Sequence, residues 1–198
     1  MAVTTVLFVV CYDILKRRQF KMAFIVGTTL AWLGYILCCI WRAPDTRRAY
    51  GLSSHDLRQS ALLASGVFVV GATFCLVVAF THQRLHLYPH MLLSALLYPA
   101  WGLVQQTLVQ AMVVRNLSGS LATPWVVVIA GLLFGAVHWP DLALAAATAI
   151  LGAVFTVIFL HWPSVWALGL CHGWLGVLFY FWVLKRDPWE KTMPGAHS

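Results

Sequence analysis

The sequence predicts an all-α protein, a polytopic bundle of transmembrane helices. Of its 198 residues, 61% are hydrophobic and only 10% are charged, whereas soluble domains are about one quarter charged. The mean hydropathy is +0.82. A helix needs roughly 20 mostly apolar residues to cross the hydrocarbon core of a bilayer, and several runs approach that length. An ordinary soluble domain is therefore excluded.

Seven apolar runs are candidate spans. They are Ala2–Leu15, Phe20–Trp41, Ala61–Phe80, Met91–Val114, Trp125–His138, Leu142–His161 and Trp166–Leu184. The first and fifth are short, and only Trp139-Pro140-Asp141 separates the fifth from the sixth, which is typical of a tight hairpin. We expect one structural domain made of N-terminal spans with an interfacial loop (1–60), a helical core (61–184) and a polar tail (185–198).

The net charge of +7 lies in the segments between the spans. Clusters such as Arg47-Arg48 and Lys185-Arg186 predict contact with anionic lipid headgroups, where each basic residue contributes about 1 kcal/mol. If seven spans alternate, more Lys and Arg residues lie on the side of the membrane that holds the C-terminus. The positive-inside rule then favours a cytoplasmic C-terminus in the cell (inner) membrane. The first run is followed rather than preceded by basic residues, so we expect it to be retained rather than cleaved. No motif for binding nucleic acid accompanies the charge.

Small residues and serines predict local structure at several points. Because lipid tails are as apolar as the helices, close backbone approach supplies much of the attraction between helices in a membrane. The sequence offers two GxxxG motifs and one further ridge of small residues: Gly131 with Gly135, Gly169 with Gly173, and Ala145, Ala149 and Gly152. In the loop before the third run, Ser53 or Ser54 is expected to cap a short interfacial helix.

Strongly polar side chains inside the spans are few, and each marks a candidate site because its burial in a membrane is costly. They are Gln105, Gln106, Gln110, His138, His161 and His172, with Asp13 and Asp141 near span ends. Gln106 and Gln110 are spaced i,i+4 and share a helix face, whereas Gln105 lies about 100° around the helix. Phe134 and His138 have the same i,i+4 spacing, so the phenyl ring is expected to brace the imidazole.

Two histidines on different helices and side-chain oxygens on a third are the ligands that a buried metal requires. Zinc binds imidazole nitrogens and oxygens in a roughly tetrahedral array. His138 and His172 are therefore candidate ligands for zinc or another divalent transition metal. The alternative interpretation is that both are neutral, hydrogen-bonded core histidines and that the glutamines hold helices together by hydrogen bonds.

The order of these motifs resembles the CPBP family, also called Abi, which includes CAAX prenyl proteases and bacteriocin-processing proteins. The family pattern is EExxxR on one span, FxxxH at the end of the next and HxxxN on the last. The corresponding segments here are Gln105-Gln106-Thr-Leu-Val-Gln110, Phe134-Gly-Ala-Val-His138 and His172-Gly-Trp-Leu-Gly176. The resemblance covers roughly residues 61–184 and implies a CAAX-protease-like helical core. It also implies a reacting centre formed by Gln105, Gln106, His138 and His172, with Gln110, Phe134 and Gly176 in support.

The departures from the family pattern affect the chemistry. Family hydrolysis is understood as a glutamate taking a proton from water, but both glutamate positions here are glutamine, and a glutamine amide has no useful basicity near neutral pH. The only glutamate of the chain is Glu190, in the tail. Asp141 is the carboxylate nearest in sequence to a motif histidine and the best substitute base, although its place after Pro140 favours a helix N-cap.

Three functions remain open from the sequence. The first is an intramembrane, metal-dependent endopeptidase with an altered site, whose ordinary proteolysis is absent or reduced and whose substrate is a prenylated or membrane-anchored peptide. The second is a non-catalytic pseudoenzyme that serves as a scaffold or as a subunit of a complex with a partner membrane protein. The third is a pigment- or lipid-binding protein that uses its buried histidines as ligands or polar contacts.

Overall fold

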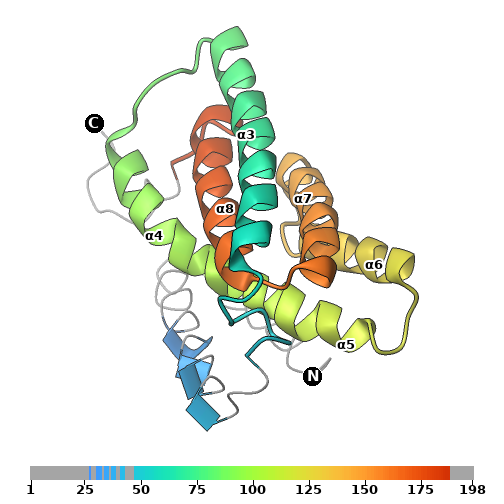
Figure 1. The fold of residues 1–198 in the computed structure, drawn as a ribbon. Coiled ribbons are helices and arrows are strands. Elements are labelled where there is room, and N and C mark those ends of the chain that lie inside the picture. Colours follow the sequence, from blue (N-terminus) through green and yellow to red (C-terminus); the bar gives the residue numbers. More distant parts are fainter. Residues whose placement is uncertain are drawn as a thin grey trace.

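The computed structural model describes residues 47–187 and scattered helical positions between Gly27 and Arg42. Every regular element in these residues is a helix (Figure 1). In chain order they are α3 (Leu57–Thr81), α4 (Pro89–Gln106), the π-helix η2 (Thr107–Val114), α5 (Arg115–Leu117), α6 (Thr123–Ala136), α7 (Leu142–His161), α8 (Val165–Leu178) and the π-helix η3 (Phe179–Val183). The candidate span Ala2–Leu15 and the tail from residue 188 lie outside the described residues.

Within residues 47–187, four helical segments are long and apolar enough to cross a membrane. They are Leu57–Thr81, Pro89–Leu117, Leu142–His161 and Val165–Val183. The helix α6 has 14 residues, which gives about 21 Å of length, less than the ~30 Å hydrocarbon core. The all-α membrane bundle is thus confirmed, whereas the seven spans are not. The orientation of the C-terminus stays a prediction.

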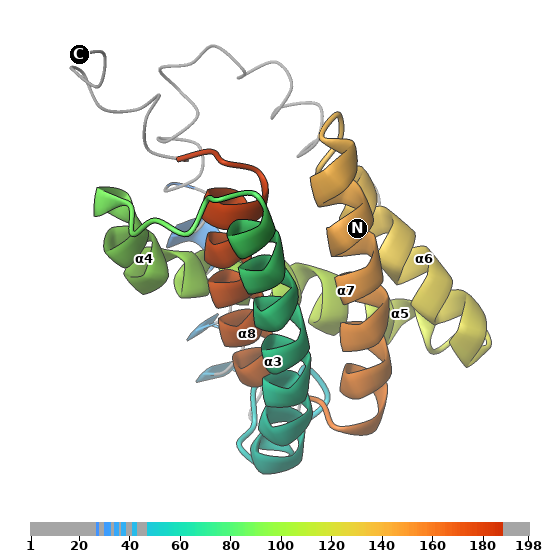
Figure 2. The same cartoon turned by 90° about the horizontal axis from the view of Figure 1, so that it is seen from above.

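The helix α8 lies at the centre of the described bundle. It packs against α4 on one side and α3 on the other, while α6 pairs with α7 (Figures 1 and 2). In the most apolar stretch of the α8–η3 span 61% of the residues are buried, against 11% in α3. In the described bundle, α3 therefore contributes few buried residues, whereas α8 carries much of the core.

The crossing of α4 and α8 depends on glycine. A Cβ atom on Gly102 would lie 2.3 Å from the carbonyl oxygen of Gly169, and one on Gly173 would lie 2.6 Å from the Cα of Pro99. At these positions no larger residue fits without separating the two backbones. The contact predicted from the Gly169–Gly173 motif is confirmed.

The second GxxxG motif joins α6 to α7. A Cβ atom on Gly131 would lie 2.8 Å from the carbonyl oxygen of Ala149, and one on Gly135 would lie 2.7 Å from that of Ala145. The small-residue ridge predicted on α7 is therefore the surface that receives α6. Two tightly packed helix pairs, α4–α8 and α6–α7, position the side chains described below.

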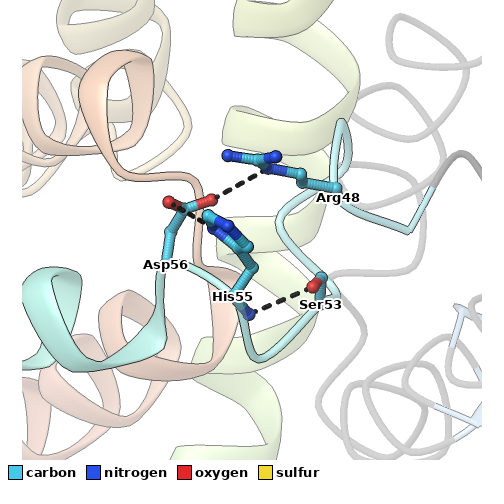
Figure 3. A network of polar contacts seen from close by, with 4 residues as sticks. All are labelled: Arg48, Ser53, His55 and Asp56. Atoms are coloured by element: carbon cyan, nitrogen blue, oxygen red, sulfur yellow. Dashed lines mark hydrogen bonds and ion pairs between the residues drawn. The ribbon is translucent and has the colours of Figure 1, made fainter.

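The loop before α3 folds differently from its prediction. The helix begins at Leu57, with Asp56 at the N-cap position and no side-chain hydrogen bond there, so neither serine caps it. Ser53 Oγ instead accepts a hydrogen bond from the His55 backbone N–H at 3.1 Å (Figure 3). The serine prediction was wrong because the loop forms turns of its own: Leu52 N–H donates to the Arg47 carbonyl at 2.8 Å.

Candidate functional site

The residues singled out by the three motifs come from three helices. Gln105 and Gln106 end α4, Phe134 lies near the end of α6, and His172 lies in the middle of α8. His138 follows α6 in the turn before α7. Because the glycine crossing brings α4 and α8 into backbone contact, short side chains reach from one helix to the other. We call this cluster the polar site.

The central contact of the polar site joins Gln105 to His172. The Gln105 Oε1 atom lies 2.9 Å from His172 Nε2. An amide oxygen only accepts hydrogen bonds, so Nε2 carries the hydrogen and Nδ1 holds an unshared electron pair. His172 is 8% exposed, and within the described part of the chain its Nδ1 has no hydrogen-bond partner. The imidazole thus offers one buried acceptor.

Phe134 places the two motif histidines around one ring. Its centroid lies 5.4 Å from that of His138 and 5.1 Å from that of His172, both in edge-to-face geometry. Gly152 of α7 makes room for the ring, because a Cβ there would lie 3.0 Å from Phe134 Cδ1. The bracing predicted from the i,i+4 spacing is confirmed, and Phe134 also braces His172.

The tautomer of His138 is set by its neighbours. Its Nδ1 donates to the Phe134 carbonyl oxygen at 2.8 Å, which leaves Nε2 with an unshared pair. Thr148 Oγ1 lies 3.2 Å from the same Nδ1 and donates to the Leu144 carbonyl at 2.7 Å. Sequence reasoning missed Thr148, whose only signal is a hydroxyl within a largely apolar helix.

The other two glutamines form a fully buried polar ladder. Gln106 and Gln110 are both 0% exposed, and Gln110 Nε2 donates to Gln106 Oε1 at 3.2 Å. Thr156 Oγ1 of α7 lies 3.3 Å from Gln110 Oε1. The Nε2 of Gln106 has no hydrogen-bond partner among the residues that the structure describes. The ladder thus links α4 to α7 and leaves one buried donor unmatched.

The backbone changes within this ladder. The α-helical hydrogen bonding of α4 ends at Gln106, and η2 continues the same helix as a π-helix from Thr107. Thr107 Oγ1 donates to the Leu103 carbonyl at 2.8 Å at this junction. Such π segments are rare and often lie at functional sites. Sequence periodicity predicted one uniform helix and gave no sign of the change.

Asp141 lies at the start of α7. Its Oδ1 accepts from the Leu144 backbone N–H at 3.2 Å, and its Oδ2 forms an ion pair with Arg186. The predicted N-cap is confirmed. With both oxygens engaged, Asp141 secures the turn before α7 and the start of the tail, an arrangement that does not favour the role of substitute base.

Gly176 occupies the position where the family pattern has asparagine. It lies one turn after His172 on α8, and a Cβ there would make an ordinary 3.7 Å contact with Tyr98 Cδ1. Unlike Gly173, Gly176 is therefore not required for close helix packing. Space around a Cβ atom therefore does not explain why glycine stands at this position.

The polar site supplies only some of the ligand atoms that a metal ion needs. His138 Nε2 and His172 Nδ1 both carry unshared pairs, and in each ring the other nitrogen is held by a hydrogen bond, as is usual for metal-binding histidine. Catalytic zinc takes three protein ligands. In the part of the chain that the structure describes, no three His, Cys, Asp or Glu side chains gather as a metal site, and both nearby amide oxygens already accept hydrogen bonds.

The comparisons with known proteins agree with the motifs. Residues 87–178 match the family model of type II CAAX prenyl endopeptidase, Rce1-like. This segment begins just before α4 and ends with α8, so it contains the whole polar site. Neither the curated proteins nor the solved structures give a match. The resemblance predicted from the three motifs is confirmed over these residues.

Proposed function

We propose that this membrane protein, whose residues 87–178 are those of a CAAX-protease-family core, binds a prenylated or membrane-anchored peptide in its polar site without hydrolysing it. The observation that carries the proposal is the 2.9 Å hydrogen bond between His172 Nε2 and Gln105 Oε1. An amide stands where the family pattern has the glutamate that takes a proton from water. The protein is then a pseudoenzyme of its family.

Neither glutamine replaces the missing base. The Gln105 oxygen is occupied by the imidazole N–H, and the Gln106 oxygen is occupied by the Gln110 amide. An amide oxygen also has no useful basicity near neutral pH. Water bound to either amide would be hydrogen-bonded but not deprotonated, so the glutamines supply no proton acceptor for the step that begins hydrolysis.

The unmatched atoms support binding. Gln106 Nε2 is a buried donor and His172 Nδ1 is a buried acceptor, both without a partner. Leaving such a group unsatisfied costs about 1–3 kcal/mol, so a ligand or water that satisfies it gains that free energy. A peptide group carries one carbonyl acceptor and one N–H donor, which are the two complementary groups. Its lipid anchor would lie among the apolar helices.

The test restores the family residues stepwise. The variants are Gln105→Glu/Gln106→Glu and the triple variant Gln105→Glu/Gln106→Glu/Gln110→Arg, which restores the family's cation as well as its carboxylates; thermal unfolding checks that each is folded. Each is reconstituted with a prenylated CAAX peptide, beside an intact family protease, and both binding and cleavage are measured. We expect the unmodified protein to bind the peptide without cleaving it and the triple variant to gain cleavage. Failure of the unmodified protein to bind the peptide would refute the proposal.

A second candidate, a metal-dependent hydrolase, is favoured by the two imidazoles with fixed tautomers. The metal content of the purified protein is compared with that of His138→Ala/His172→Ala, with thermal unfolding as the folding control. The binding proposal predicts no stoichiometric transition metal in either protein. Zinc near one equivalent that is lost in the variant would favour the hydrolase instead.

A further inference from the structure

A pocket of about 590 Å³ lies where the loop before α3 meets the start of α8. It is lined by Arg47, Arg48, Leu52, Ser53, Ser54, Leu57 and Trp166. We call it the basic pocket. Most of its lining precedes the segment that matches the family model, and none of it belongs to the polar site. It is therefore a separate feature of this chain.

The loop that forms the basic pocket is fixed to the helical core. The Gly51 carbonyl oxygen accepts from the Val165 backbone N–H at 2.9 Å, and Trp166 Nε1 donates to the Leu52 carbonyl at 3.1 Å. Gly51 has a φ of +66°, and a Cβ there would lie 2.6 Å from a ring carbon of Phe159. Glycine thus permits the tight docking, and the pocket wall is preorganised.

Charge in the basic pocket is arranged around Asp56, which stands beside the lining. Arg48 Nε lies 3.5 Å from Asp56 Oδ2, and His55 Nδ1 lies 3.0 Å from Oδ1 (Figure 3). The Asp56 side chain is 14% exposed and that of Arg48 is 63% exposed. The ion pair therefore engages the inner nitrogen of the guanidinium group and leaves its two terminal nitrogens available to a ligand.

The chemistry of the lining matches a phosphate diester. Arg47 and Arg48 are the charged residues of the lining, and the Arg48 side chain is 63% exposed. Arginine binds phosphate oxygens through paired N–H groups. The 25-residue helix α3 begins at this pocket without a side-chain cap, and its positive end favours an anion. Leu52, Leu57 and Trp166 supply an apolar wall for the carbons beside the phosphate.

From this lining we infer that the basic pocket binds the phosphate of an anionic phospholipid headgroup. The position of the basic pocket agrees with this inference. It lies at the end of the bundle where α3 and α8 begin, and both helices belong to segments long enough to span a membrane. Tryptophan is also typical of the membrane interface. The inference does not depend on the function of the polar site.

The test measures binding of short-chain phosphatidylglycerol, phosphatidylcholine and inorganic phosphate to the full chain in neutral detergent. The variants are Arg48→Gln and Ser54→Asp, which places a negative charge in the lining. The matched control is Arg58→Gln, because Arg58 is an exposed arginine of α3 outside the lining. Thermal unfolding checks that every variant is folded.

We expect phosphatidylglycerol to bind more tightly than phosphatidylcholine, and each pocket variant to weaken its binding about fivefold. Arg58→Gln should leave the affinity unchanged. An equal loss in Arg48→Gln and Arg58→Gln would mean general surface attraction and would overturn the inference. So would unchanged binding in both pocket variants, or displacement of the lipid by an equal concentration of inorganic phosphate.

Discussion

The polar site between α4 and α8 and the basic pocket beside α3 hold their polar groups in different ways. In the polar site the hydrogen bonds join amides, imidazoles and a hydroxyl, as in the Gln105–His172 and Gln106–Gln110 pairs. In the basic pocket the contacts join an arginine to a carboxylate. The difference follows from location, since a charge costs far more inside the hydrocarbon than at its surface.

This contrast also explains why three positions differ from the family motif together. The pattern EExxxR carries two negative charges and one positive charge, and its counterpart here is three glutamines. A single remaining charge would have lost its partner, which is strongly destabilising when buried. Uncharged amides preserve hydrogen bonding across the helices but lack the basicity of a glutamate. Under the proposed function, the absence of hydrolysis and the stability of the site would follow from the same three substitutions.

The largest expected loss of stability comes from a substitution at the α4–α8 crossing, which positions the polar site. Gly173→Val should destabilise the protein by about 4 kcal/mol or more, because the new side chain meets the backbone of Pro99. Gly66→Val on α3 is the control, since a Cβ there meets no atom within 4 Å. Thermal unfolding in detergent compares the two. Equal stability of both variants would show that the helices do not cross this closely.

A carboxylate introduced into the polar site and another introduced into the basic pocket test whether a charge costs more stability in the first region than in the second. Gln110→Glu should cost about 3 kcal/mol, because the fully buried carboxylate loses the amide donor to Gln106 and has no cation beside it. Ser54→Asp, at an exposed position of the basic pocket, should change stability by less than about 0.5 kcal/mol. Unfolding free energies from denaturant titration decide the matter. Similar costs at both positions would remove the distinction drawn between the two regions.

The smallest expected effect concerns the hydroxyl at the end of the glutamine ladder. Thr156→Val should cost about 1 kcal/mol, because Gln110 loses its contact with α7. Thr81→Val is the matched control: Thr81 is exposed, and its hydroxyl bonds only carbonyls of its own helix. The same titration should separate the two variants. If Thr81→Val costs as much, Thr156 contributes nothing through the ladder.

Local spacing in the sequence predicted much of the polar site. The GxxxG motifs gave both close helix contacts, and the i,i+4 spacing gave the Phe134–His138 contact, because these depend only on helix geometry. The Asp141 cap was equally local. Thr148 and Thr156 were missed because a threonine in an apolar helix also satisfies its hydroxyl on its own backbone, as both do here. Nothing in the pattern distinguishes that role from a contact with a neighbouring helix.

Contacts between segments that are far apart in the chain could not be predicted from the sequence. The basic pocket depends on the docking of Gly51 against Val165 and on Trp166 beneath the loop. Composition predicted only that Arg47 and Arg48 lie near headgroups. The prediction of seven spans is not confirmed for a related reason, since the run Trp125–His138 has the hydropathy of a span but forms a helix of 14 residues that ends at Ala136.

The most direct test of the central claim is a cleavage assay on the unmodified protein. The full chain is reconstituted in vesicles of phosphatidylcholine and phosphatidylglycerol with a prenylated CAAX peptide, beside an intact family protease. Because amides stand where the family pattern has its glutamate base, we predict that the peptide is bound and that no product accumulates while the protease completes its reaction. Product that accumulates with time and disappears in a folded His172→Ala variant would contradict the account.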